Sequence, residues 1–199
     1  MKDILKLGIT LFAICAVAAL VLGVTNNITA PVIEQRNIQA SNESRQIVLS
    51  DAEEFKELEG MNSDIVVEVY EGLKGGEVIG YTIKTAPKGY GGTVEVMVGI
   101  SIDGKVTGVD IGNHSETPGL GSKAAEPAFK DQYKDKSVSN NLEVIKGSAS
   151  NENEISAISG ATITSKGVTT GVNAAIEIFN EKLSNKNVSA IEVFENRGV

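Results

Sequence analysis

Residues 93–111 read TVEVMVGISIDGKVTGVDI and predict a β-hairpin. β-Branched residues alternate with small or polar ones on both sides of an Asp-Gly pair, and Asp-Gly is a preferred turn between antiparallel strands. Similar runs lie upstream at 65–71 and 78–85, and a glycine-rich segment, 87–92, separates them from the hairpin. The sequence therefore predicts an antiparallel meander.

A second regular pattern, near the C-terminus, predicts a long helix. Apolar residues recur there at steps of three and four, which places them on one helix face. These residues are Val168, Val172, Ala175, Ile176, Phe179 and Leu183. Shorter helices are expected at 51–58 and near 123–133, and a further strand at 142–145. Together these elements predict an α+β domain with an antiparallel sheet and flanking helices.

Residues 7–25 contain no charged residue and are long enough to cross a bilayer. At about 1.5 Å per residue the run spans about 28 Å, close to the roughly 30 Å hydrocarbon core. Lys2 and Lys6 precede it and the next basic residue is Arg36, so the positive-inside rule places the N-terminus in the cytoplasm. A cleaved signal peptide is the alternative, although its apolar run is only about 7–15 residues long.

The apolar run and the predicted strands that follow it divide the chain into three expected parts. They are an uncleaved single-pass anchor at 1–30, a helical linker at 31–60 and an extracytoplasmic domain at 61–199.

The composition disfavours several kinds of function. The chain carries 18 Lys+Arg against 26 Asp+Glu, and its formal charge of −8 is too acidic for general nucleic-acid binding. One Cys and one His form neither an internal disulfide nor an iron–sulfur cluster nor a zinc site of the usual type. His114 lies beside Ser115 without a visible third partner, which disfavours a hydrolase. Redox chemistry would therefore need a bound organic cofactor.

Two loops contain the candidate functional residues. The first, 158–165, reads ISGATITS directly before the final helix, where free backbone N–H groups and the helix dipole favour a phosphate. Its plainer interpretation is an ordinary helix start capped by Thr164 or Ser165. The second loop, 114–121, reads HSETPGLG and places polar groups beside an apolar leucine. It is equally compatible with a long surface connection.

The two loops, in this order and behind a single anchor, resemble the FMN-binding domain of the RnfG and NqrC subunits. The motifs that carry the resemblance are ETPGLG at 116–121 and SGATIT at 159–164, with GYGG at 89–92 and VGI at 98–100. These subunits belong to the Rnf ferredoxin:NAD oxidoreductase and to the Na⁺-translocating NADH:quinone reductase. The resemblance spans essentially the whole chain, whose length favours RnfG.

The resemblance implies FMN as the cofactor, joined by a phosphoester to the last threonine of the S/T-G-A-T motif by a flavin transferase of the ApbE type. That threonine is Thr162, with Thr164 as the nearby competitor. The residues expected to line the flavin ring are Glu116, Thr117 and Leu120. Those expected beside the phosphate are Ser159, Gly160, Ala161 and Thr164. One departure is Ser156, which stands where the transferase recognition pattern usually has Asp.

The function implied by the resemblance is that of an electron carrier in a membrane complex. Other Rnf subunits would provide the ferredoxin, NAD and ion sites, and electron transfer would be coupled to Na⁺ or H⁺ export. No catalytic residue and no metal ligand is expected in this chain. Two alternatives are a membrane-anchored FMN domain of another extracytoplasmic reductase and a structural or solute-binding module without flavin.

Overall fold

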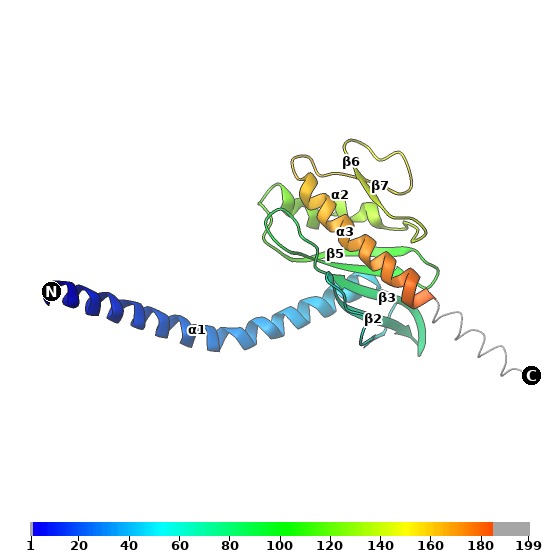
Figure 1. Ribbon diagram of the computed structural model, residues 1–199. Helices are drawn as coiled ribbons and strands as arrows, with labels where there is room; N and C mark the ends of the chain where they lie inside the picture. The colour runs from blue at the N-terminus through cyan, green and yellow to red at the C-terminus, as the bar shows by residue number, and fades with distance from the viewer. Residues whose placement is uncertain (1, 185–199) are drawn as a thin grey trace, which may run out of the picture. The chain divides into compact units, whose positions relative to one another are not determined.

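The computed structural model describes residues 2–184 and consists of two compact units that divide after Ala40. Helix α1 (Lys2–Val48) contains the apolar run found in the sequence and continues through Pro31 (Figure 1). Among the described residues it is the one helix long and apolar enough to cross a membrane, and none of its most apolar window is buried. Such a helix fits a single-pass membrane protein, because lipid would cover its apolar side chains.

The second unit contains a five-stranded antiparallel sheet in the order β1-β2-β3-β4-β5. Its strands are β1 (Glu54–Glu57), β2 (Val66–Lys74), β3 (Glu77–Thr85), β4 (Val94–Ser101) and β5 (Val106–His114). Each strand pairs with the next along the chain, so the predicted meander and its hairpin are confirmed. Gly104 has a φ of +75° in the connection between β4 and β5, a conformation that glycine adopts without strain.

The helix predicted at 51–58 is wrong, because residues 54–57 form the edge strand β1. Glu54 lies opposite Leu73 of β2 and Glu57 opposite Tyr70. The acidic residues of this segment resemble a helix N-terminus, but pairing with the free edge of β2 satisfies more backbone groups than one isolated helical turn would.

Helix α3 (Thr162–Ile178) packs against one face of the sheet, where it contacts β3 and β4 (Figure 1). The predicted apolar face of this helix is buried, and it continues into a π-helical turn at Phe179–Leu183. The Phe179 ring meets the Tyr81 ring edge-on, with 6.0 Å between centroids. The helix that periodicity predicts therefore provides one half of the core.

The last residues of α1 belong to the same unit and pack on the opposite face. Side chains alternate along a strand, so Gly80 and Gly99 face away from α3. A Cβ atom on Gly99 would lie 2.3 Å from the carbonyl oxygen of Val48, and one on Gly80 would lie 3.1 Å from the Leu49 side chain. Glycine at these positions lets the end of the helix approach the strands closely.

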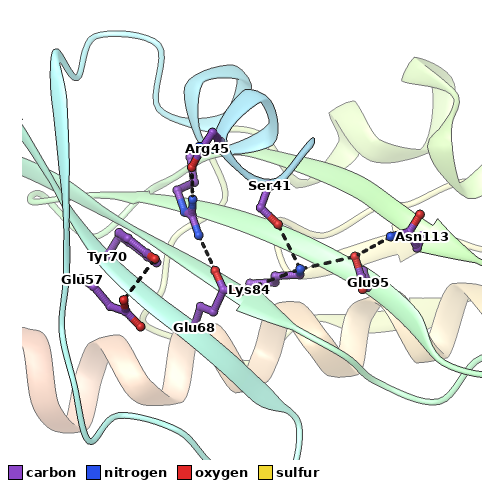
Figure 2. Close-up of polar contacts among 9 residues, drawn as sticks. Ser41, Arg45, Glu57, Glu68, Tyr70, Lys84, Glu95 and Asn113 are labelled. Carbon is purple, nitrogen blue, oxygen red and sulfur yellow. Dashed lines mark hydrogen bonds and ion pairs between the residues drawn. The ribbon is translucent and has the colours of Figure 1, made fainter. Parts of the chain in front are cut away.

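Polar contacts join the end of α1 to this face (Figure 2). Arg45 is buried, forms an ion pair with Glu68, and holds its guanidinium 3.7 Å from the centre of the Tyr70 ring. The Lys84 ammonium donates a hydrogen bond of 3.0 Å to Ser41. The segment from residue 41 to residue 48 is thus held by charges as well as by close packing.

The connection from β5 to α3 contains short elements. They are the 3-10 helices η1 (Gly121–Ala125) and η2 (Asp131–Tyr133), the one-turn helix α2 (Pro127–Lys130), and a parallel pair β6 (Glu143–Ile145) and β7 (Glu154–Ser156). The single helix expected near 123–133 is therefore three short helical segments, and the strand expected at 142–145 is β6.

Candidate functional site

A cavity of about 430 Å³ lies beside the N-terminus of α3. Three segments form it: the glycine-rich loop after β3, the loop after β5, and the start of α3. Its lining residues are Tyr90, Glu116, Thr117, Leu120, Gly121, Gly160, Ala161, Ile163 and Thr164. The volume lies within the roughly 300–1,000 Å³ of small-molecule sites. The fold therefore brings together the two loops that the sequence singles out.

Glu116 joins the three segments at the wall of this cavity. It is 6% exposed, and its Oε1 accepts hydrogen bonds from the backbone N–H groups of Tyr90 (2.8 Å) and Gly91 (3.0 Å). Its Oε2 accepts a hydrogen bond of 2.6 Å from the hydroxyl of Thr164. One carboxylate thus ties the glycine-rich loop to the first turn of α3.

The hydrogen bonds keep this carboxyl ionised. Burial by itself raises the pKa of Glu116, but the hydrogen bonds from Thr164, Gly91 and Tyr90, together with nearby His114, outweigh it and lower the pKa below the ordinary 4.5. Donors directed at a carboxylate favour its charged form. The cavity wall therefore carries a negative charge at neutral pH.

Glycines allow the approach of these segments. A Cβ atom on Gly121 would lie 2.3 Å from Glu116 Oε2 and 2.7 Å from Thr164 Oγ1, and one on Gly91 would lie 2.1 Å from the Ser115 carbonyl oxygen. A side chain at either position would force the loops apart. Gly121 of the ETPGLG motif and Gly91 of the GYGG motif thus let the backbone pack closely around the Glu116 carboxylate.

Glu116 is expected to make the stability of the protein depend on acidity. Because its pKa is lowered in the folded state, its contribution is complete above the unfolded value of 4.5 and is lost as the pH falls through the lower folded value. As the pH falls below 4.5, the free energy of unfolding should therefore fall more steeply in the wild type than in Glu116→Gln. Denaturant titrations of both proteins at several pH values measure this, and parallel curves would contradict it.

The predicted site residues take two kinds of position. Glu116, Thr117, Leu120, Gly160, Ala161 and Thr164 line the cavity. Ser159 and Thr162 lie in the same loop but outside the lining set, Ser159 being exposed and Thr162 half-buried at the first position of α3.

The helix start differs from its plainer interpretation. Ala161 occupies the N-cap position without a side-chain cap, so neither Thr164 nor Ser165 caps the helix. Ser165 is buried one turn in, where its hydroxyl donates to the Ala161 carbonyl and accepts from the Ile158 N–H, both at 3.0 Å. This bridge fixes the loop that contains Thr162.

Two further residues line the cavity that the motifs alone did not indicate. Tyr90 is 70% exposed and Ile163 is 55% exposed, and with Leu120 they form an apolar rim around the cavity. Tyr90 lies in the GYGG motif, for which the sequence predicts no contact with a cofactor. Nothing in the local pattern distinguishes Ile163 from an ordinary residue of an amphipathic helix.

Family models match two parts of the chain. Residues 89–177 match a model described as FMN-binding domain, and residues 1–45 match one described as RnfG N-terminal region. The first match spans all three segments around the cavity. The second covers the apolar helix and most of its continuation.

Relatives of nearly the same length are similar along most of the chain. The G subunit of the Na⁺-translocating ferredoxin:NAD⁺ oxidoreductase complex of Acetobacterium woodii is 46% identical over 192 residues, with 89% of this chain and 92% of the relative covered. The G subunit of the proton-translocating ferredoxin:NAD⁺ oxidoreductase complex of Clostridium ljungdahlii is 37% identical over 163 residues, with 82% and 84% covered.

A solved structure shows a similar fold. The crystal structure of Shewanella oneidensis NqrC superimposes with a TM-score of 0.51 at 20% sequence identity, over 66% of this chain and 69% of that one. The α+β architecture with its antiparallel sheet is therefore shared with that protein.

Proposed function

This chain belongs to the RnfG family of electron-carrying flavoprotein subunits, and we propose that it relays electrons through FMN joined covalently to Thr162. The FMN-binding domain and the relatives make it a subunit of an ion-translocating oxidoreductase complex.

The observation that carries the proposal is the contrast between two neighbouring threonines. Thr164 is 1% exposed and its hydroxyl donates to Glu116, so a modifying enzyme cannot reach it in the folded protein. Thr162 is half-buried between the cavity-lining residues Ala161 and Ile163, and its hydroxyl has no hydrogen-bond partner among residues 2–184. Of the two threonines of the SGATIT motif, Thr162 is therefore the one whose hydroxyl oxygen is available as a nucleophile.

The surroundings of Thr162 fit the two chemically different ends of FMN. The first backbone N–H groups of a helix have no partner within it and favour a phosphate, and Thr162 begins a 17-residue helix. The apolar rim of Tyr90, Leu120 and Ile163 lies beside this helix start and supplies contacts for a flat aromatic ring. Phosphate and ring would thus be held by adjacent parts of one site.

Attachment requires a transferase and an activated donor. The hydroxyl oxygen of Thr162 forms a bond to the flavin phosphorus of a flavin dinucleotide, the pyrophosphate bond breaks, and the nucleoside monophosphate leaves. The hydroxyl proton passes to a base of the transferase, which we propose to be of the ApbE type. No electrons are transferred in this step.

When bound, FMN supplies the redox chemistry, and the chain provides its tether, its orientation and its electrostatic surroundings. A covalent tether keeps the cofactor from being lost by dilution outside the membrane. In this proposal other subunits hold the ferredoxin, NAD and ion sites, and electron relay contributes to Na⁺ or H⁺ export. The names of the Acetobacterium and Clostridium relatives support both choices of ion.

We place the FMN domain outside the cytoplasmic membrane, because Lys2 and Lys6 precede the apolar run and no basic residue follows it before Arg36. Cys15 is the only cysteine, so a Cys15→Ser background permits single-cysteine labelling. A membrane-impermeant maleimide added to intact cells should label Ser148→Cys in an exposed loop and should not label Asp3→Cys until the cells are opened. The reverse pattern would contradict this orientation.

The test of the proposed function is the intact mass of the full-length protein made with and without a flavin transferase. We expect an increase equal to FMN minus one water only when the transferase is present. Trypsin cleaves after Lys146 and Lys166, so the peptide 147–166 contains both Thr162 and Thr164, and fragmentation locates the group. An unmodified chain beside a modified control substrate would refute covalent attachment, and modification of Thr164 would move the site.

A further inference from the structure

Glu116 uses most of its hydrogen-bonding capacity within the protein. An ionised carboxylate has about four acceptor positions, and three of them are taken by Tyr90, Gly91 and Thr164. Its own backbone N–H lies 3.3 Å from His114 Nδ1. The side chain therefore has little capacity left to accept hydrogen bonds from a ligand.

The carboxylate is also locked in place by close packing. A Cβ atom on Gly89 would lie 2.3 Å from Glu116 Oε1, and Gly121 approaches Oε2 equally closely. The groups that donate to this carboxylate come from distant parts of the chain: Tyr90 and Gly91 lie 26 and 25 residues upstream, and Thr164 lies 48 residues downstream. Its removal would release both walls of the cavity at once.

From this arrangement we propose that Glu116 is a positioning residue of the flavin site: it fixes the glycine-rich loop against the first turn of α3 and holds a permanent negative charge beside the cofactor, which lowers the reduction potential. The inference rests on the proposed function and deepens it. A fixed negative charge opposes the addition of electrons nearby, and it does so more strongly at a partly desolvated wall than in water.

The second role of Glu116 concerns the choice between threonines. By accepting the Thr164 hydroxyl, Glu116 removes that oxygen from the surface and fixes the turn that presents Thr162. The distance of 2.6 Å is typical of a hydroxyl that donates to a carboxylate. One residue thereby sets both the geometry and the electrostatics of the site.

The experiment is a potentiometric titration of the full-length, flavinylated protein in detergent, after its FMN content has been measured by mass. Glu116→Gln keeps the shape and removes the charge, and Glu116→Asp keeps the charge on a shorter side chain. Glu152→Gln is the matched control, because it removes one charge from an exposed loop. We expect a shift to more positive potential in Glu116→Gln alone, and a lower denaturation midpoint in Glu116→Asp.

The outcomes separate this inference from the function on which it rests. A wild-type protein without FMN would refute the proposed function before any potential is measured. A loaded Glu116→Gln protein with the wild-type potential would overturn the inference and leave the function standing. An equal shift in Glu152→Gln would also overturn it, because the effect would then be one of overall charge.

A second pair of variants applies if Glu116→Gln takes up no FMN. Thr164→Ser retains the hydroxyl donor to Glu116, whereas Thr164→Val removes it. Hydrogen–deuterium exchange at the Tyr90 and Gly91 amides should accelerate in Thr164→Val and stay at the wild-type rate in Thr164→Ser. Equal exchange in the two variants would overturn the positioning role.

Discussion

Replacement of Thr162 by valine is expected to abolish FMN attachment completely, whereas Thr164→Ser should be flavinylated like the wild type. Valine keeps the shape of threonine and lacks the oxygen that forms the phosphoester. Serine at 164 retains the hydroxyl that donates to Glu116. The readouts are flavin fluorescence of the denatured protein in a gel and the intact mass of each variant.

The comparison also tests the structural reason for the difference. Both threonines lie in the first turn of α3, and only their burial and partners distinguish them. Covalent FMN on Thr162→Val, located at Thr164, would show that the Glu116 hydrogen bond does not protect the second hydroxyl. A folded Thr162→Val protein without covalent FMN, at the wild-type denaturation midpoint, would support the assignment.

The largest expected effect on stability follows from Gly99→Ala in the middle of β4. The added methyl group would lie 2.3 Å from the Val48 carbonyl oxygen and 2.4 Å from Thr107 Oγ1, so the end of α1 must move off the sheet. Overpacking of this kind costs about 1–3 kcal/mol. For a chain of this size, where 1 kcal/mol corresponds to about 2–4 °C, we expect a fall of roughly 2–12 °C in the denaturation temperature.

Gly112→Ala in β5 is the matched control for this prediction. A Cβ atom there meets only the half-buried Glu95, at 3.1 Å from Oε2 and 3.2 Å from Cβ, and both distances are much longer than the 2.3 Å at Gly99. Thermal unfolding of both full-length variants in the same detergent should therefore separate them clearly. If both variants lose the same stability, close packing at Val48 is not the cause.

Local pattern was enough to predict the central part of the fold. Alternation and the Asp-Gly pair identify β4 and β5, and a period of three to four residues identifies α3, because both signals arise from neighbours along the chain. The strand β1 carries no such signal. It exists through its pairing with β2, which residues 54–57 do not encode by themselves.

The site, like the fold, was predictable where the signal lies in neighbouring residues and not where it depends on distant ones. Both motifs could be located from the sequence, and the structure brings them together. The hydrogen-bond partners of Glu116 could not be predicted from the sequence, since they lie 25 to 48 residues away along the chain. That Glu116 lines the flavin ring stays a prediction, and the positioning role proposed beside it depends on tertiary contacts.

The packing of the last turns of α1 has a consequence for any soluble fragment of this protein. Val48, Leu49 and Ala52 are buried, and β1 covers one edge of the sheet. A fragment that begins at residue 61 would lack all of these, and the uncovered edge of β2 would be free to pair with another copy of the chain. Recombinant flavin domains that begin at or before Ser41 should stay monomeric, and those that begin after β1 should aggregate.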